Sequence, residues 1–146
     1  MEQYKYFYRF RNTAVSLYDK NEENYSDSEP VNFNANVAFD FNRNDSVLSC
    51  KFTVVAFQAQ KICLKIVFVC EFDIKEESIK GATQADGSIV FSKSLLIQLA
   101  SLNYGTLRGV LVERLKDSKM SSMILPPLYV ESVIKEDYIL KEITAQ

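Results

Sequence analysis

The fold of this chain is decided by the stretch Ser92–Pro127, which reads SKSLLIQLASLNYGTLRGVLVERLKDSKMSSMILPP. At 3.6 residues per turn, the large side chains fall on one arc of a helix: Leu96, Leu99, Ala100, Leu107, Val110 and Leu111. Ser101, Gly105 and Gly109 recur at four-residue steps on nearly the opposite side. Because a glycine inside a helix costs about 1 kcal/mol relative to alanine, two of them in register indicate that another backbone approaches closely.

We therefore expect a helix that is buried on two sides, by its own domain and by a second body. The alternative interpretation is that two tolerated glycines break the helix near residues 103–105.

The composition is that of one ordinary folded domain spanning residues 1–146. The apolar fraction of 47% and the charged fraction of 25% are both typical of a protein with a real core. A net charge of −2 predicts no broad attraction to nucleic acid or to an anionic membrane. We find neither a signal peptide at the start nor an apolar run long enough to span a bilayer, so we expect no membrane insertion.

Histidine is absent from the chain, which excludes histidine-based acid–base catalysis, histidine-based triads and histidine-containing metal sites. Three cysteines, Cys50, Cys63 and Cys70, lie in apolar runs without CxxC spacing. That pattern favours reduced, buried thiols in a cytoplasm over a disulfide framework. We expect a protein that is not an enzyme and that has no cofactor and no metal site.

Alternation of apolar and polar residues predicts four strands before the helix. The first begins at Tyr4, has one heavily aromatic face and extends in looser form to Leu17; the others cover residues 31–41, 47–58 and 61–73. Short turns join the last three into a meander, and the polar residues 19–30 form the crossover that leads to them.

An irregular connection over residues 74–90 leads to the long helix, which Ser92 or Ser94 caps and which ends within residues 117–122. The two prolines after it fix an extended segment. The spacing of Val130, Val133, Ile134 and Tyr138 then predicts a short amphipathic helix. The fold class is α+β: a four-stranded antiparallel sheet covered on one face by a long helix and a short C-terminal helix.

The order and spacing of two motifs resemble those of a known family. A long helix containing Thr106-Leu107-Arg108-Gly109, a polar connection and then Ile124-Leu125-Pro126-Pro127 resembles the SecB family of bacterial protein-export chaperones, in particular its divergent SecB-like members. The likeness spans nearly the whole chain, from Tyr4 to about Ile134. It implies a dimer of dimers in the bacterial cytoplasm, and a holdase that binds unfolded or pre-export polypeptides in long apolar grooves.

In the family, the groove lies between the first strands with their crossover and the second helix with its preceding loop. Carried over residue by residue, the resemblance points to eight client-binding positions: Tyr6, Tyr8, Phe10, Met120, Met123, Ile124, Leu128 and Val133. Ordinary core and loop packing is the competing interpretation for each of them. The stripe of Ser101, Gly105 and Gly109 is the expected interface between subunits.

One departure from the family concerns the SecA motor, which docks on acidic residues of the open sheet face. Here the corresponding faces mix Lys51, Lys61 and Lys65 with Asp40, Glu71 and Asp73, which puts docking of SecA in doubt. Two other functions stay open: a SecB-shaped protein dedicated to one partner, for example an antitoxin-type client, and more remotely a small-molecule-binding α+β domain.

Overall fold

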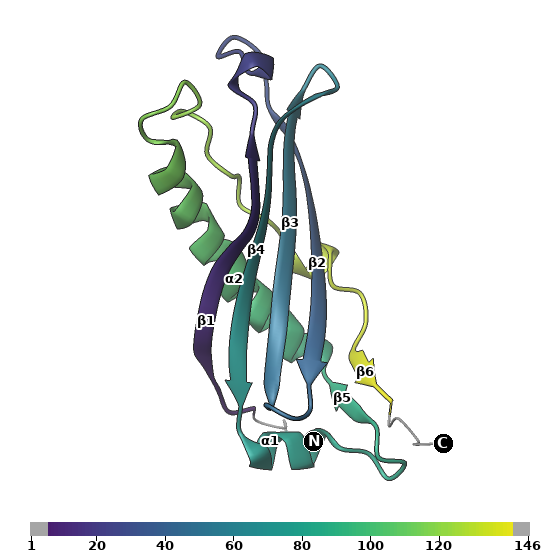
Figure 1. The fold of residues 1–146 in the computed structure, drawn as a ribbon. Coiled ribbons are helices and arrows are strands. Elements are labelled where there is room, and N and C mark those ends of the chain that lie inside the picture. The colour runs from purple at the N-terminus through teal and green to yellow at the C-terminus, as the bar shows by residue number, and fades with distance from the viewer. Residues whose placement is uncertain (1–5, 142–146) are drawn as a thin grey trace, which may run out of the picture.

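A four-stranded antiparallel sheet forms the body of the protein in the computed structural model, which describes residues 6–141. Its strands are β1 (Tyr8–Lys20), β2 (Asn32–Asn42), β3 (Val47–Gln58) and β4 (Lys61–Ile74), in the order β1-β4-β3-β2. Residues 21–31, with the 3-10 turn η1 (Glu22–Asn24), cross over the end of the sheet between its two edge strands (Figure 1). The predicted meander and crossover are confirmed, while Tyr4 lies outside the described residues.

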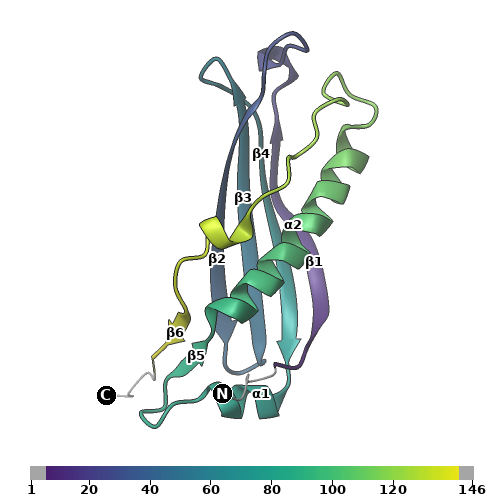
Figure 2. The same cartoon turned by 180° about the vertical axis from the view of Figure 1, so that it is seen from behind.

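The second half of the chain adds helices and a small sheet. Helix α1 (Glu76–Ala82) follows β4, and helix α2 (Lys93–Leu115) is the long helix. Strands β5 (Ile89–Phe91) and β6 (Tyr138–Leu140) pair antiparallel beside the main sheet, and the 3-10 turn η2 (Val130–Ser132) precedes β6. Figure 2 shows the chain after α2 returning along the helix side of the sheet toward β6.

Helix α2 lies diagonally across one face of the sheet, as Figures 1 and 2 show from opposite sides. The Ser92 side chain caps it by accepting a hydrogen bond from the Leu95 amide at 3.3 Å. Its leucines are buried against the sheet, and the Asn103 amide group donates to the Cys50 carbonyl on β3 at 2.8 Å. The helix is continuous through residues 103–105, so the interpretation that the glycines break it is wrong.

By length and composition alone, α2 could cross a membrane, so the expectation that no apolar run is long enough does not hold. In the structure nine of its residues are buried, and they include Leu99, Leu107 and Leu111. The helix therefore uses its apolar side to cover the sheet.

The predicted C-terminal helix is only the three-residue turn η2. Val130 and Ile134 are buried as a helical stripe would be, but the chain then leaves the helical path. The Asp137 carboxylate accepts a hydrogen bond from the Lys93 amide at 2.6 Å, and Tyr138 pairs with Phe91 in the small sheet. These tertiary contacts outweigh a helix of one or two turns, since such a helix makes few backbone bonds.

The other face of the main sheet is open. Phe52, Phe68 and their neighbours on the helix side are buried, whereas Lys51, Lys65, Asp40, Glu71 and Asp73 project from the opposite face. Arg9 and Arg11 on β1 each form an ion pair with Asp73 at 3.1 Å. The mixture of lysines and carboxylates expected on this face is therefore present.

Candidate functional site

An aromatic cluster surrounds the start of β1. Tyr6 and Tyr8 are half-buried, and Phe10 is 45% exposed. The rings of Tyr8 and Phe10 lie 5.7 and 4.8 Å from the buried ring of Phe72 on β4. These side chains thus rest on the core and still present part of their surface, because α2 runs over β3 and β4 and leaves β1 largely uncovered. Partial burial raises the pKa of the Tyr8 hydroxyl.

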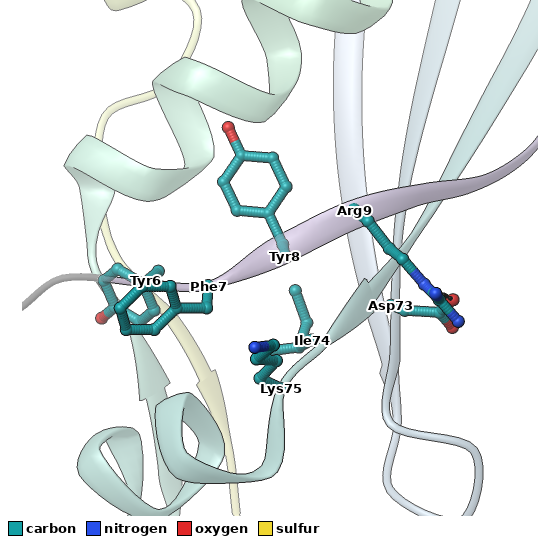
Figure 3. A pocket seen from close by; sticks show the side chains of 7 residues that line it. All are labelled: Tyr6, Phe7, Tyr8, Arg9, Asp73, Ile74 and Lys75. Atoms are coloured by element: carbon teal, nitrogen blue, oxygen red, sulfur yellow. Dashed lines mark hydrogen bonds and ion pairs between the residues drawn. The ribbon is translucent and has the colours of Figure 1, made fainter.

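A cavity of about 610 Å³ opens beside this cluster (Figure 3). Its lining comes from the start of β1 and from the end of β4: Tyr6, Phe7, Tyr8, Arg9, Asp73, Ile74 and Lys75. Figure 3 shows the Tyr8 ring pointing toward α2 while Arg9 and Asp73 meet on the other side of β1. The walls are mainly apolar, so the cavity suits an apolar side chain of a partner.

Charged groups mark two sides of the cavity. Hydrogen bonds from Arg11 and Arg9 hold the pKa of the Asp73 carboxyl below its usual value. On the other side, the Lys75 ammonium lies 5.7 Å from the centre of the Phe7 ring, within the range of a cation–π contact. Phe7 itself is 43% exposed, and no sequence prediction singled it out. The period of the strand could have pointed to Phe7, because it alternates with Tyr6 and Tyr8 and so faces the opposite side of the strand from them.

The two methionines of the expected second wall lie at the opposite end of β1 from the aromatic cluster. Lys20, the last residue of β1, pairs with Leu64, whereas Tyr8 pairs with Ile74, so the crossover is one strand length away from the aromatic cluster. Both methionines lie in residues 116–129, which we call the strap. The strap meets the crossover through Ser122 and Tyr25. The structure therefore does not bring the two methionines together with Tyr6, Tyr8 and Phe10.

Met120 and Met123 are buried, at 0% and 5% exposure. The hydroxyls of Tyr25 in the crossover and Ser122 in the strap lie 3.0 Å apart, and this hydrogen bond joins the two segments beside the methionines. The crossover is fixed in turn by Gln58, whose carboxamide binds the backbone of Ser26 and Glu29 in three hydrogen bonds of 2.8–2.9 Å. In a single chain these methionines are part of the core.

The remaining predicted client-binding residues lie along the strap and after it. Ile124 is 61% exposed, while Leu128 and Val133 are half-buried. Val133 lines a smaller cavity of about 300 Å³ between β2 and the C-terminal segment, with Val37, Phe39 and Tyr138 among its other walls. This cavity was not predicted, because the sequence does not reveal that the C-terminal segment runs beside β2.

The glycine stripe of α2 faces away from the sheet. Ser101, Gly105 and Gly109 are all exposed, and a Cβ atom added at either glycine would meet nothing within 4 Å. Leu102 and Val112, which are 38% and 52% exposed, flank the same stripe. Within one chain, then, nothing that the structure describes requires glycine at these two positions.

The surroundings of the three cysteines do not favour a reactive thiol. All three are free and buried, and Cys50 lies directly opposite Cys70 in the β3–β4 register. Burial raises the pKa of the Cys70 thiol to about 11, and burial together with the neighbouring Cys70 raises the pKa of Cys50 further. Among residues 6–141, no three histidine, cysteine, aspartate or glutamate side chains gather as a metal site would require.

Comparison with known proteins gives a remote structural likeness. No family model matches the chain, and no curated protein matches it. Among solved structures, it is similar to the SecB-like chaperone of Mycobacterium tuberculosis in complex with a ChAD peptide from the HigA1 antitoxin. The two share 14% identity with a TM-score of 0.44, over 83% of this chain and 90% of that chain. A likeness of this size does not place the chain in a family.

Proposed function

We propose that the protein is a holdase chaperone that binds unfolded polypeptides through apolar side chains and involves no chemical step. The observation that carries this proposal is the aromatic start of β1, where partly exposed rings border an apolar cavity of about 610 Å³. Exposed aromatic surface next to a cavity is the expected chemistry for taking up apolar side chains of another chain.

The physical basis of binding is burial of apolar area, at about 25 cal/mol per Å² removed from water. Such binding does not read a sequence, and it holds a client in its unfolded form by mass action. The resemblance of the helix and Leu-Pro-Pro motifs to SecB-like chaperones supports the same function. A bacterial cytoplasm suits the three free thiols. The lysines on the open sheet face disfavour SecA as a partner and leave a role in protein export without support.

We also propose that the protein self-associates through α2, as a dimer or a dimer of dimers. The uncovered face of Ser101, Gly105 and Gly109 supports this, because a second subunit would explain why two glycines persist in a helix interior.

The test of the holdase is suppression of aggregation for several unrelated unfolded proteins, without nucleotide. We expect near-stoichiometric protein to suppress aggregation of more than one client. Phe7→Ser and Phe10→Ser should each weaken suppression at least about threefold, since Phe7 is an exposed ring of the cavity lining and Phe10 an exposed ring of the aromatic cluster. Ile139→Ser is the matched control, because Ile139 is 58% exposed on β6, away from the cavity lining, and should leave suppression unchanged.

Client range separates the two main functions. Suppression of a single client among many would favour a protein dedicated to one partner. No suppression of any client, or equal loss in the control variant, would contradict the holdase.

A further inference from the structure

The strap contains a short run whose backbone is fixed by its sequence, Ile124–Tyr129, with the residues ILPPLY. Each proline holds its own φ near −65°, and each disfavours the helical region for the residue before it. The run belongs to no helix and no strand. These restraints favour a polyproline II path, which has three residues per turn.

Burial along the run follows this period of three. Leu125, at 2% exposure, and the half-buried Leu128 point inward three residues apart. Pro126 and Tyr129, also three apart, are exposed, as are Ile124 and Pro127. Tyr129 and Ile124, at 73% and 61%, are the most exposed large apolar side chains in the part of the chain that the structure describes.

Helix α2 holds the run from its inner side. The Tyr104 hydroxyl donates to the Pro126 carbonyl at 2.6 Å, and the Arg108 Nε donates to the Leu125 carbonyl at 3.0 Å. Figure 2 shows the strap descending on the same side of the sheet as α2. The run is therefore ordered before any partner arrives, which lowers the entropic cost of binding it.

Recognition of this run must come through its side chains. The two prolines lack N–H groups, and the carbonyls of Leu125 and Pro126 are already bonded to α2, so the run cannot act as an edge strand for another sheet. What it presents is two outward rows, Ile124 with Pro127 and Pro126 with Tyr129. Aromatic-lined grooves bind proline rings presented with this three-residue period in polyproline II recognition.

We propose that Ile124–Tyr129 is a docking segment for a protein domain whose aromatic-lined groove reads Pro-Pro-x-Tyr in the polyproline II conformation. The protein is then a ligand as well as a holder of clients. This inference does not rest on the proposed holdase function, because it uses neither the cavity beside β1 nor the aromatic cluster.

The experiment uses a fluorescently labelled WW domain of the class that reads Pro-Pro-x-Tyr, titrated with the full chain and followed by anisotropy. We expect saturable binding, and we expect Tyr129→Ala to weaken it about thirtyfold or more, as loss of a central aromatic anchor does. Tyr104→Phe should weaken binding by a smaller factor, since it removes an anchor of the backbone and leaves the docking surface intact. Ile139→Ala, at an exposed apolar position on β6, should bind like the wild type.

Three results would overturn the docking proposal. The first is no binding, or equal binding by Tyr129→Ala. The second is a change in the sedimenting mass of the protein itself on Tyr129→Ala, which would mean that a second copy covers the segment. The third is loss of aggregation suppression in Tyr129→Ala to the extent seen in Phe10→Ser, which would make the segment client-binding surface. A failed aggregation assay with intact WW binding would reject the holdase alone.

Discussion

The two ends of β1 carry similar apolar chemistry and differ in what lies over it. At the start of the strand, Tyr6, Tyr8 and Phe10 rest on the core, and Tyr6 and Tyr8 border an open cavity. At the far end, Met120 and Met123 are as apolar, yet the crossover and the strap close over them through Tyr25 and Ser122. The comparison teaches that polar residues in loops decide which apolar side chains are available to a partner.

The largest expected effect of a substitution is at the closed end. Met120→Ala should lower the free energy of unfolding by about 2–5 kcal/mol, because it leaves a cavity around a side chain that is fully buried. Phe7→Ala, at the open end, should cost less than about 1 kcal/mol, since surface changes usually have small effects. Chemical denaturation of both variants measures the difference. Equal costs would show that the closed end opens in solution or that the open end is covered.

Much of this contrast could not be read from the sequence. Period-two alternation located β2, β3 and β4 to within a residue or so, and Ser92 is the one of the two predicted caps, Ser92 and Ser94, that caps α2. Those features depend on local periodicity and capping. Met120 is buried in the region where the strap meets the crossover, and Gln58 fixes that crossover from about thirty positions further along the chain, which no local pattern records.

The candidate site shows the same limit. The resemblance to the SecB family and the alternation of aromatic residues pointed to Tyr6, Tyr8 and Phe10 as candidates. Their partial exposure follows from the position of α2, which leaves β1 largely uncovered and which the sequence does not show. The short C-terminal helix was wrongly extended because Val130, Val133 and Ile134 fit a helical period, whereas Asp137 and Tyr138 tie the chain into other contacts.

The outer face of α2 is a third apolar region, and it is exposed in a single chain. A substitution there tests whether a second subunit covers it in the assembly. Gly109→Leu places a large side chain where a single chain has free space. If a second subunit packs there, overpacking should cost about 1–3 kcal/mol per site, and symmetry repeats that cost in every subunit. We expect a smaller sedimenting mass at micromolar concentration, with the sheet still folded by circular dichroism.

The opposite outcome for Gly109→Leu has its own signature. If the stripe faces water, replacing glycine should favour the helix by up to about 1 kcal/mol. An unchanged mass with a higher melting temperature would then contradict self-association through this face, as would a wild-type protein that sediments as a 16.7 kDa monomer.

The smallest expected effect concerns the charges at the open end of β1. Hydrogen bonds from Arg11 and Arg9 lower the pKa of Asp73 from its ordinary value of 3.8. A carboxyl with a lowered pKa in the folded state adds stability at pH values above its unfolded pKa, and this stability is lost as the pH falls through the folded pKa. Asp73→Asn should therefore flatten the fall in melting temperature below about pH 4, and it should lower the melting temperature at pH 7 by at most a few degrees, because exposed ion pairs contribute little.

Asp40→Asn is the control, since Asp40 lies on the same open face and forms no ion pair among residues 6–141. If both variants show the same melting temperatures from pH 7 to pH 2, the ion pairs of the two arginines with Asp73 add no stability. Aromatic packing alone then stabilises the open end of β1.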